Sequence, residues 1–332
     1  MARTRAGLRR TAAAIAMGVA VLTMGVPTIA AADKEAPAPP GPIGDPTGNG
    51  AWPAIAESRA DAPGYTIYRP ADMPAEPLPL VLWGNGGCRD AGLTASHFLR
   101  EIASHGYVIV ANGAPRGERP VKTGIPGEDA VGAPAPTLPL TPPRREPDET
   151  STDQLLAAID WAAEANGRTG DDLEGHVDTT RIAVMGHSCG GLQALQAGAD
   201  PRVDTVVAFA SGVYVRRGSG LSGVDITKAD LVRLHTPVAY VLGGPTDIAY
   251  ANGMDDFDRI GHVPVMAASI PVGHDGTLSY AAGGDWALVG TAWLDWQLKQ
   301  DEAARHWFVG PDCRLCVSPE WTIQRKNFPE TP

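Results

Sequence analysis

The stretch of sequence that decides the fold is Arg181-Ile182-Ala183-Val184-Met185-Gly186-His187-Ser188-Cys189-Gly190-Gly191. Its first half is a continuous apolar run, typical of a strand buried on both faces of a parallel sheet. Its second half holds the pentad G-x-S-x-G, and apolar residues at helical spacing follow. The pentad alone is a weak indication in a chain with 39 glycines, where an ordinary βα turn with a surface serine is the alternative. Strand, turn and helix in this order predict that Ser188 is an exposed nucleophile beside the N–H groups of a helix start.

Apolar segments and amphipathic helices alternate along the rest of the chain. This alternation predicts an α/β fold, with a mostly parallel central sheet flanked by helices on both faces. The weakly alternating segment 65–68 predicts an outer strand. We find no internal repeat and expect one catalytic domain over residues 56–332. The further strands expected are 78–83, 107–111, 205–209, 237–242 and 263–270, and the helices include 152–166, 249–260 and 285–300.

The N-terminus has the composition of a secretory signal peptide. Four arginines among the first ten residues precede the apolar stretch Thr11–Val26, and Ala30-Ala31-Ala32 offers a cleavage site. The apolar stretch is about 16 residues long, which is short of the roughly 20 that a membrane anchor needs. Arg9-Arg10 leaves a twin-arginine export route open. We therefore expect a secreted, extracellular protein from which residues 1–32 are removed by cleavage near Ala32.

Charge restricts the partners of the mature chain. Without residues 1–32 it has 23 basic and 38 acidic residues, a formal net charge of −15. This acidity argues against nucleic acid or an anionic membrane as a partner. Residues 33–55, which are rich in Pro, Gly and Ala, are expected to form a linker.

Two long segments show no periodicity. Residues 112–150 hold nine prolines, and loops this long in compact domains are usually functional or disordered. We expect this loop insertion to form a wall or lid of a cleft, with surface decoration as the alternative. Residues 211–235 are expected to line the same cleft. Trp286, Trp293 and Trp296 are expected in the core, with a sugar-stacking platform as the alternative.

A serine nucleophile needs a histidine base and an acid to orient it, and the chain has one candidate for each role directly after an expected strand. Asp247 follows the strand expected at 237–242, and His274 follows the strand expected at 263–270. The chain order Ser188, Asp247, His274 is that of the α/β-hydrolase triad. His274 would take the proton of the Ser188 hydroxyl and return it to the leaving alcohol, and Asp247 would orient the imidazole and stabilise its cation.

Other acids compete with Asp247 for this role. Asp255, Asp256 and Asp275 lie nearby in the sequence, and Asp275 adjoins His274. Sequence neighbours seldom reach each other's ring nitrogen, which disfavours Asp275. Asp247 could instead be a helix N-cap, and His274 a loop histidine without a task.

Two backbone N–H groups must form the oxyanion hole. One donor is expected to be the amide of Cys189, directly after the nucleophile. The other is expected from the loop Gly84-Asn85-Gly86-Gly87, where we favour the Asn85 amide and hold Gly86 as the alternative.

Four cysteines in an exported chain predict two disulfide bonds. We favour Cys88–Cys189, which would join the two halves of the oxyanion hole, and Cys313–Cys316. The first pair requires Cα atoms no more than about 7 Å apart. A zinc site is the alternative, although the ligand spacing is wrong for it, and a redox role for C-R-L-C is another. We expect the cysteines to staple the C-terminal tail, residues 312–332, to the domain.

Four segments carry a resemblance to a known family: Ala103–Val108, Val177–Ser188, Gly244–Ala249 and Gly273-His274. Over about residues 60–300 the chain resembles the secreted α/β-hydrolases of the dienelactone hydrolase-like and bacterial polyester hydrolase (cutinase-like) group. The resemblance implies an esterase for short acyl esters, polyesters or plant-wall esters that needs no metal or organic cofactor. The chain departs from the polyester hydrolases at two positions, with Cys189 in place of their usual Met and Asn85 in place of an aromatic residue.

Together these features predict a secreted serine carboxylic-ester hydrolase that forms an acyl-enzyme on Ser188. We expect it to act as a monomer, without cofactor or metal, on a small-molecule or polymeric ester. Fold and triad leave the acyl acceptor open, so a serine peptidase or an acyltransferase is the alternative within the same chemistry. A non-catalytic, cell-wall-associated binding protein is the alternative from another class.

Overall fold

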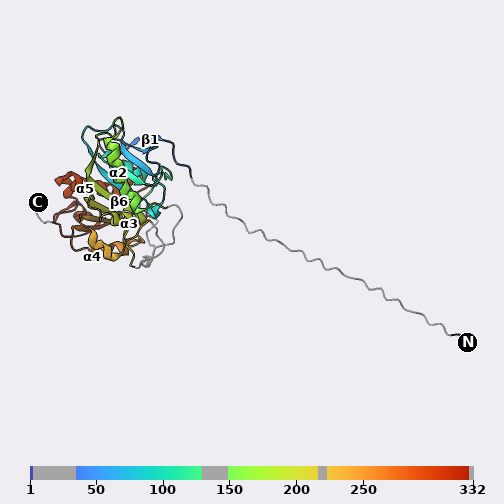
Figure 1. The fold of residues 1–332 in the computed structure, drawn as a ribbon. Coiled ribbons are helices and arrows are strands. Elements are labelled where there is room, and N and C mark those ends of the chain that lie inside the picture. The colour runs from blue at the N-terminus through green and yellow to red at the C-terminus, as the bar shows by residue number, and fades with distance from the viewer. Residues whose placement is uncertain (3–34, 129–148, 216–222, 329–332) are drawn as a thin grey trace. The chain divides into compact units, whose positions relative to one another are not determined.

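The computed structural model describes residues 1–2, 35–128, 149–215 and 223–328. Over the described residues from 35 onward, ten strands form one sheet (Figure 1). The strands from β5 to β9 are parallel, and those nearer the two edges pair antiparallel. Their order across the sheet is β1 (Gly41–Thr47), β2 (Ala54–Ser58), β3 (Tyr65–Pro70), β5 (Val108–Asn112), β4 (Leu78–Gly84), β6 (Val177–His187), β7 (Thr205–Phe209), β8 (Val238–Leu242), β9 (Val265–Ser269) and β10 (Thr322–Lys326).

Helices cover both faces of this sheet and divide the core into two layers. Side chains of a strand point alternately to its two faces. Accordingly, Val81 and Trp83 of β4 pack with one group of helices, and Leu80 and Leu82 pack with the other. The first group is α1 (Ser96–Ser104) and α5 (Gly284–Lys299); the second is α2 (Thr152–Gly167), α3 (Cys189–Ala197) and α4 (Tyr250–Arg259). The predicted α/β-hydrolase fold is confirmed.

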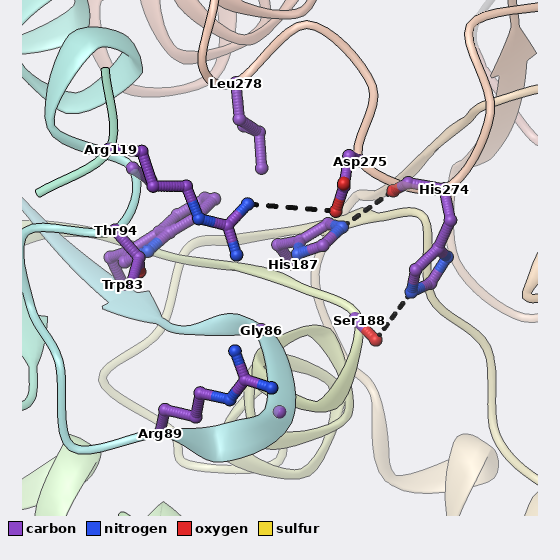
Figure 2. Close-up of a pocket in the computed structure, with 12 residues that line it drawn as sticks. Trp83, Gly86, Arg89, Thr94, Arg119, His187, Ser188, His274, Asp275 and Leu278 are labelled. Carbon is purple, nitrogen blue, oxygen red and sulfur yellow. Dashed lines mark hydrogen bonds and ion pairs between the residues drawn. The ribbon is translucent and has the colours of Figure 1, made fainter. Parts of the chain in front are cut away.

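The strand order places a crevice at the carboxyl ends of β4 and β6. From β4 the chain moves to β5 on one side and then to β6 on the other. Such a reversal opens a space outside the carboxyl ends of the strands, where α/β folds bind their ligands. The loops that follow β4 and β6 line the pocket of Figure 2.

The linker predicted over residues 33–55 is wrong for part of its length. Residues 41–47 form the edge strand β1, and Ala54 and Ile55 begin the buried strand β2. Because five of the seven residues of β1 are exposed, the strand needs no apolar alternation. Its prolines are tolerated because an edge strand leaves N–H groups without a ladder partner. The segment 65–68 is consequently not an outer strand, since β1 and β2 lie beyond it.

The C-terminal tail is held differently from the prediction. Cys313 and Cys316 bond to each other, which closes a local loop and attaches nothing to the domain. The attachment comes from β10, which pairs antiparallel with β9 from Thr322 to Lys326. This strand has few apolar residues and two basic ones, as suits an exposed edge.

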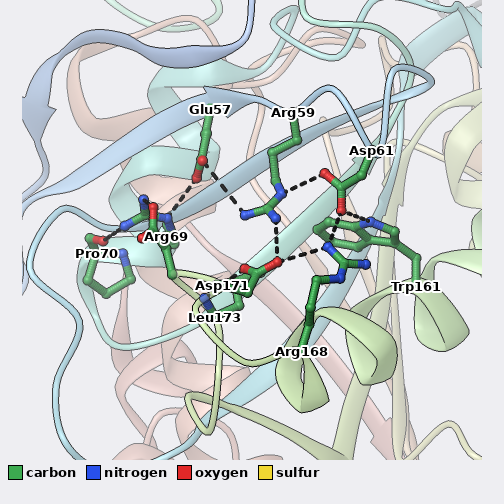
Figure 3. Close-up of polar contacts among 10 residues, drawn as sticks. Glu57, Arg59, Asp61, Arg69, Pro70, Trp161, Arg168, Asp171 and Leu173 are labelled. Atoms are coloured by element: carbon green, nitrogen blue, oxygen red, sulfur yellow. Dashed lines mark hydrogen bonds and ion pairs between the residues drawn. The ribbon is translucent and has the colours of Figure 1, made fainter.

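A network of ion pairs ties β2 and β3 to the segment after α2 (Figure 3). Asp171 lies at its centre, with its Oδ2 atom 2.6 Å from Arg59 Nη2 and 2.9 Å from Arg168 Nη1. Asp61 accepts from the same two arginines, at 3.1 Å from Arg59 Nε and 2.7 Å from Arg168 Nη1. Because the Asp171 side chain is only 2% exposed, the network is partly withdrawn from water.

Replacing Asp171 by asparagine is therefore expected to lower the free energy of unfolding by about 1–3 kcal/mol. The loss arises because Arg59, with 12% of its side chain exposed, keeps its charge while one carboxylate partner disappears. Solvent at Arg168 reduces the effect. The control is Asp160→Asn, which removes a carboxylate that is 71% exposed and paired with Arg202. Urea unfolding curves that shift equally for both variants would contradict the role given to Asp171.

Candidate active site

Ser188 lies on a strained turn between β6 and α3. Its backbone dihedrals are φ 54° and ψ −117°, a conformation that non-glycine residues seldom adopt. A Cβ atom at Gly186 would collide with the carbonyl of Gly190, and one at Gly190 would collide with the carbonyl of Gly84. The two glycines of the pentad are thus required for β4, β6 and α3 to approach this closely, and the serine is pushed out of the sheet.

His274 and Asp247 stand in line with this serine. His274 Nε2 is 2.9 Å from Ser188 Oγ, and His274 Nδ1 is 2.6 Å from Asp247 Oδ1. Asp247 follows β8 and His274 follows β9, so the parallel strands deliver both side chains to the edge where Ser188 lies. An ionised Asp247 fixes the proton on Nδ1, which leaves Nε2 to accept from the serine hydroxyl.

Backbone groups hold the Asp247 carboxylate. Asp247 is 1% exposed, and it accepts from the N–H of Gly243 at 3.1 Å and from the N–H of Ala249 at 2.9 Å. These two backbone bonds fix the position of the carboxylate independently of its hydrogen bond to the imidazole. The alternative role of Asp247 as a helix N-cap is wrong, because the N-cap residue of α4 is Ala249.

The competing acids are engaged elsewhere. Asp255 pairs with Arg259 and Lys228, and Asp256 is buried against Lys228. Burial raises the pKa of Asp256 to about 6. Asp275 lies next to the site but faces Arg119 and Lys122, at 3.9 and 4.0 Å.

A disulfide joins the turn that carries Ser188 to the loop after β4. Cys88 and Cys189 are bonded, as predicted. Their Cα atoms are 5.2 Å apart, which is within the limit of about 7 Å for a disulfide bond. Cys313 and Cys316 form the second bond. All four cysteines are thus used in pairs, which leaves the zinc alternative without thiolate ligands. Among the described residues, no group of His, Cys, Asp or Glu is arranged to hold a metal ion.

The loop after β4 contains a side chain with a role that the sequence did not reveal. The Asn85 side chain is fully buried; its Oδ1 accepts from Trp83 Nε1–H at 2.9 Å, and its Nδ2–H donates to the carbonyl of Asn112. These bonds fix the loop from behind, while Gly86 and Gly87 face the pocket. A Cβ atom at Gly86 would meet the ring of His187. The backbone beside Ser188 is therefore held both by Asn85 and by the Cys88–Cys189 bond.

His187 is the second residue that the sequence analysis missed. It precedes Ser188, and its Nε2–H donates to the backbone carbonyl of His274 at 2.8 Å. Burial, with a smaller contribution from the neighbouring His274, lowers the pKa of His187 to about 4. His187 therefore ties the nucleophile turn to the loop that carries His274 as a neutral ring. Its position directly before Ser188, at the x of G-x-S, was the one feature of the sequence that indicated a role near the site.

This pKa predicts a pH dependence of stability. An unfolded histidine titrates near 6.5, so below that pH the unfolded chain binds a proton that the folded chain excludes until about pH 4. Stability should fall by about 1 kcal/mol per pH unit over this window. His187→Gln should flatten the dependence measured by urea unfolding at pH 7, 6 and 5, whereas His235→Gln, at an exposed histidine, should not. An unchanged slope in His187→Gln would contradict the assignment.

Two pockets open on either side of Ser188. The first, shown in Figure 2, is lined by the loop after β4, the segment around Arg119 and the loop after β9. The second is lined by residues of α3, by Tyr214 and by the segment from Ile248 to Asn252. Parts of both long irregular segments therefore border the site: Arg119 belongs to 112–150, and Tyr214 belongs to 211–235. Residues 129–148 and 216–222 of those segments lie outside the described residues.

The aromatic residues of α5 lie in the core, as predicted. Trp286 and Trp293 are fully buried, and Trp296 is partly buried against the same cluster. A sugar-stacking platform on this helix is therefore wrong. The ring centroids of Trp286 and His187 are 6.3 Å apart, so α5 packs against a residue that lines the pocket beside Ser188.

Comparison with known proteins agrees with this geometry. A search of the curated proteins found no match to the chain. Residues 142–216, which span α2, β6, the Ser188 turn, α3 and β7, match the model of a protein family described as PET hydrolase-like. The matched segment contains Ser188, and Asp247 and His274 lie beyond it. The family match and the fold support the resemblance of this chain to the polyester hydrolase, cutinase-like group of α/β-hydrolases.

Proposed function

We propose that the chain is a serine carboxylic-ester hydrolase that acts through an acyl-enzyme on Ser188. The observation that carries the proposal is the line of hydrogen bonds from Ser188 Oγ to His274 Nε2 and from His274 Nδ1 to Asp247 Oδ1, at 2.9 and 2.6 Å. The family match to PET hydrolase-like proteins supports an ester as the substrate.

The chemistry follows from these positions. Ser188 Oγ attacks the ester carbonyl carbon while His274 Nε2 takes its proton, and Asp247 stabilises the imidazolium that forms. The tetrahedral intermediate collapses, the C–O bond to the alcohol breaks, and His274 gives the proton to the departing oxygen. Water then attacks the acyl-enzyme with His274 as base, which releases the acid and restores Ser188.

The developing oxyanion requires N–H donors that are already in place. The amide of Cys189 stands at the first position of α3, where a helix has no internal acceptor for it. The second donor in this proposal is the amide of Asn85, with that of Gly86 as the alternative. The Cys88–Cys189 bond spans the two halves, and a fixed hole needs no reorganisation during the reaction.

We also propose that the protein is exported and works as a monomeric domain outside the cell. Two disulfide bonds are typical of oxidising compartments. The signal peptide predicted over residues 1–32 lies almost wholly outside the described residues. Among the described residues, no helix combines the length and apolar character needed to cross a membrane. Mass spectrometry of secreted protein beginning at Asp33 would support cleavage near Ala32.

A substrate panel tests the proposed activity. It comprises p-nitrophenyl esters of increasing chain length, acetylated xylan, a feruloyl ester and a soluble polyester, together with a peptide p-nitroanilide. We expect hydrolysis of at least the short p-nitrophenyl esters, with loss of activity in His274→Ala. Turnover of the anilide but of no ester would favour the peptidase, and acyl transfer to an added alcohol in preference to water would favour the acyltransferase. No turnover of any substrate would favour the binding protein.

A further inference from the structure

The pocket in front of Ser188 is cationic. Arg89 and Arg119 both line it, and in Figure 2 their guanidinium groups reach toward the pocket from above and below Gly86. Arg89 is exposed and Arg119 is 41% exposed, so both groups are open to a ligand. Two guanidinium groups beside the nucleophile are unexpected in a chain of net charge −11.

The backbone that carries these arginines is well held. Arg89 follows directly after the bonded Cys88, whose carbonyl accepts from Thr150 N–H at 2.7 Å. The Arg119 carbonyl is 2.8 Å from His97 Nε2 on α1. Because Thr150 is buried and His97 is half-buried in α1, the backbones that carry the two arginines are held in place by the fold.

Their charges are only weakly compensated. Asp275 is the carboxylate that lines the pocket, and it is shared between Arg119 and Lys122, at 3.9 and 4.0 Å, with 56% of its side chain exposed. Such long, exposed pairs contribute little. Within the described residues, the Arg89 guanidinium has no ion pair or hydrogen bond.

The pocket on the other side of Ser188 has a different character. Its lining includes Leu192, Tyr214, Ile248 and Ala249, and apart from His274 it contains no ionisable acid or base other than the tyrosine phenol. The two pockets beside Ser188 thus offer unlike surroundings, one lined by two arginines and one lined by apolar and neutral polar side chains together with His274.

We propose that the substrate is an ester that carries a carboxylate, which Arg89 and Arg119 bind while the uncharged part lies in the pocket lined by Leu192 and Ile248. The inference rests on the proposed esterase function and names its substrate class. A planar guanidinium donates two parallel N–H bonds to a carboxylate, which gives orientation as well as affinity. The carboxylate belongs to either the acyl or the alcohol part, as in a half-ester of a dicarboxylic acid or an ester of a hydroxy acid.

Two matched pairs of esters test this proposal. The first pair is mono-4-nitrophenyl adipate and 4-nitrophenyl hexanoate, in which the carboxylate is on the acyl part. The second is 4-(butanoyloxy)benzoate and 4-(butanoyloxy)benzamide, in which it is on the alcohol part. The quantity measured is the ratio of kcat/KM for the anionic ester to that for the neutral ester in each pair.

In the wild type we expect a ratio above 1 in at least one pair, decreasing as salt rises from about 0.05 to about 0.5 M. The double variant Arg89→Gln/Arg119→Gln should lower that ratio about 10-fold or more. The control Arg233→Gln, at an exposed arginine away from both pockets, should leave it unchanged. The pair that responds shows which part of the substrate carries the charge.

A ratio that is the same in the wild type and the double variant for both pairs would overturn the carboxylate site while leaving the esterase function in place. Failure of the wild type to hydrolyse any of the four esters would instead count against the proposed function itself.

Discussion

Ser188→Ala is expected to lower kcat for ester hydrolysis by about 10⁵-fold or more, since no other group can form the acyl-enzyme. The variant should fold normally because it removes a single oxygen atom from a partly exposed side chain. His274→Ala should cost about as much, and the double variant no more than either single one, because nucleophile and base act as a unit. Asp247→Asn should cost about 10⁴-fold by disturbing the tautomer of His274.

The measurement is the rate of p-nitrophenyl acetate hydrolysis, with circular dichroism to verify folding of each variant. Losses that add when Ser188→Ala and His274→Ala are combined would show that the two residues act in separate steps. A loss below about 10-fold in Asp247→Asn would mean that another acid orients the imidazole.

Removal of the Cys88–Cys189 bond is expected to have the second largest effect. The bond closes a loop with a sequence separation of 101 residues, and its loss should lower the free energy of unfolding by about 5 kcal/mol on the chain-entropy model. Cys88→Ala/Cys189→Ala should also lower kcat by about 10-fold or more, because the loop carrying Asn85 and Gly86 loses its attachment to the nucleophile turn.

The second disulfide supplies the matched control. Cys313→Ala/Cys316→Ala opens a loop with a sequence separation of 3, so the expected loss is about 2 kcal/mol, with kcat unchanged. Guanidinium unfolding and p-nitrophenyl acetate kinetics distinguish the two double variants. If Cys88→Ala/Cys189→Ala kept the wild-type kcat, the bond would serve stability alone.

The central strands and the positions of Ser188, Asp247 and His274 could be predicted from the sequence for a physical reason. A parallel sheet covered on both faces needs continuous apolar strands, and β6, β7, β8 and β9 have them. Loops at the carboxyl ends of such strands meet at one edge, so Ser188, Asp247 and His274 could be grouped without a structure. The structure places them within hydrogen-bond reach.

The edge strands and the supporting side chains were not accessible in this way. β1 and β10 are held by backbone hydrogen bonds with little burial, which leaves no apolar pattern to read. The buried contacts of Asn85 and His187 depend on which residues of other strands and loops come opposite them. Arg89 and Arg119 line the same pocket because of the paths of two loops, and no local sequence pattern specifies those paths.

Labelling with a fluorophosphonate probe, followed by mass spectrometry of the digested protein, tests the central claim most directly. The probe forms a covalent bond only with an activated hydroxyl nucleophile. We expect one stoichiometric adduct on the peptide containing Ser188, absent in Ser188→Ala and strongly slowed in His274→Ala. A wild-type protein that remains unlabelled, or one that carries the adduct on another residue, would contradict it.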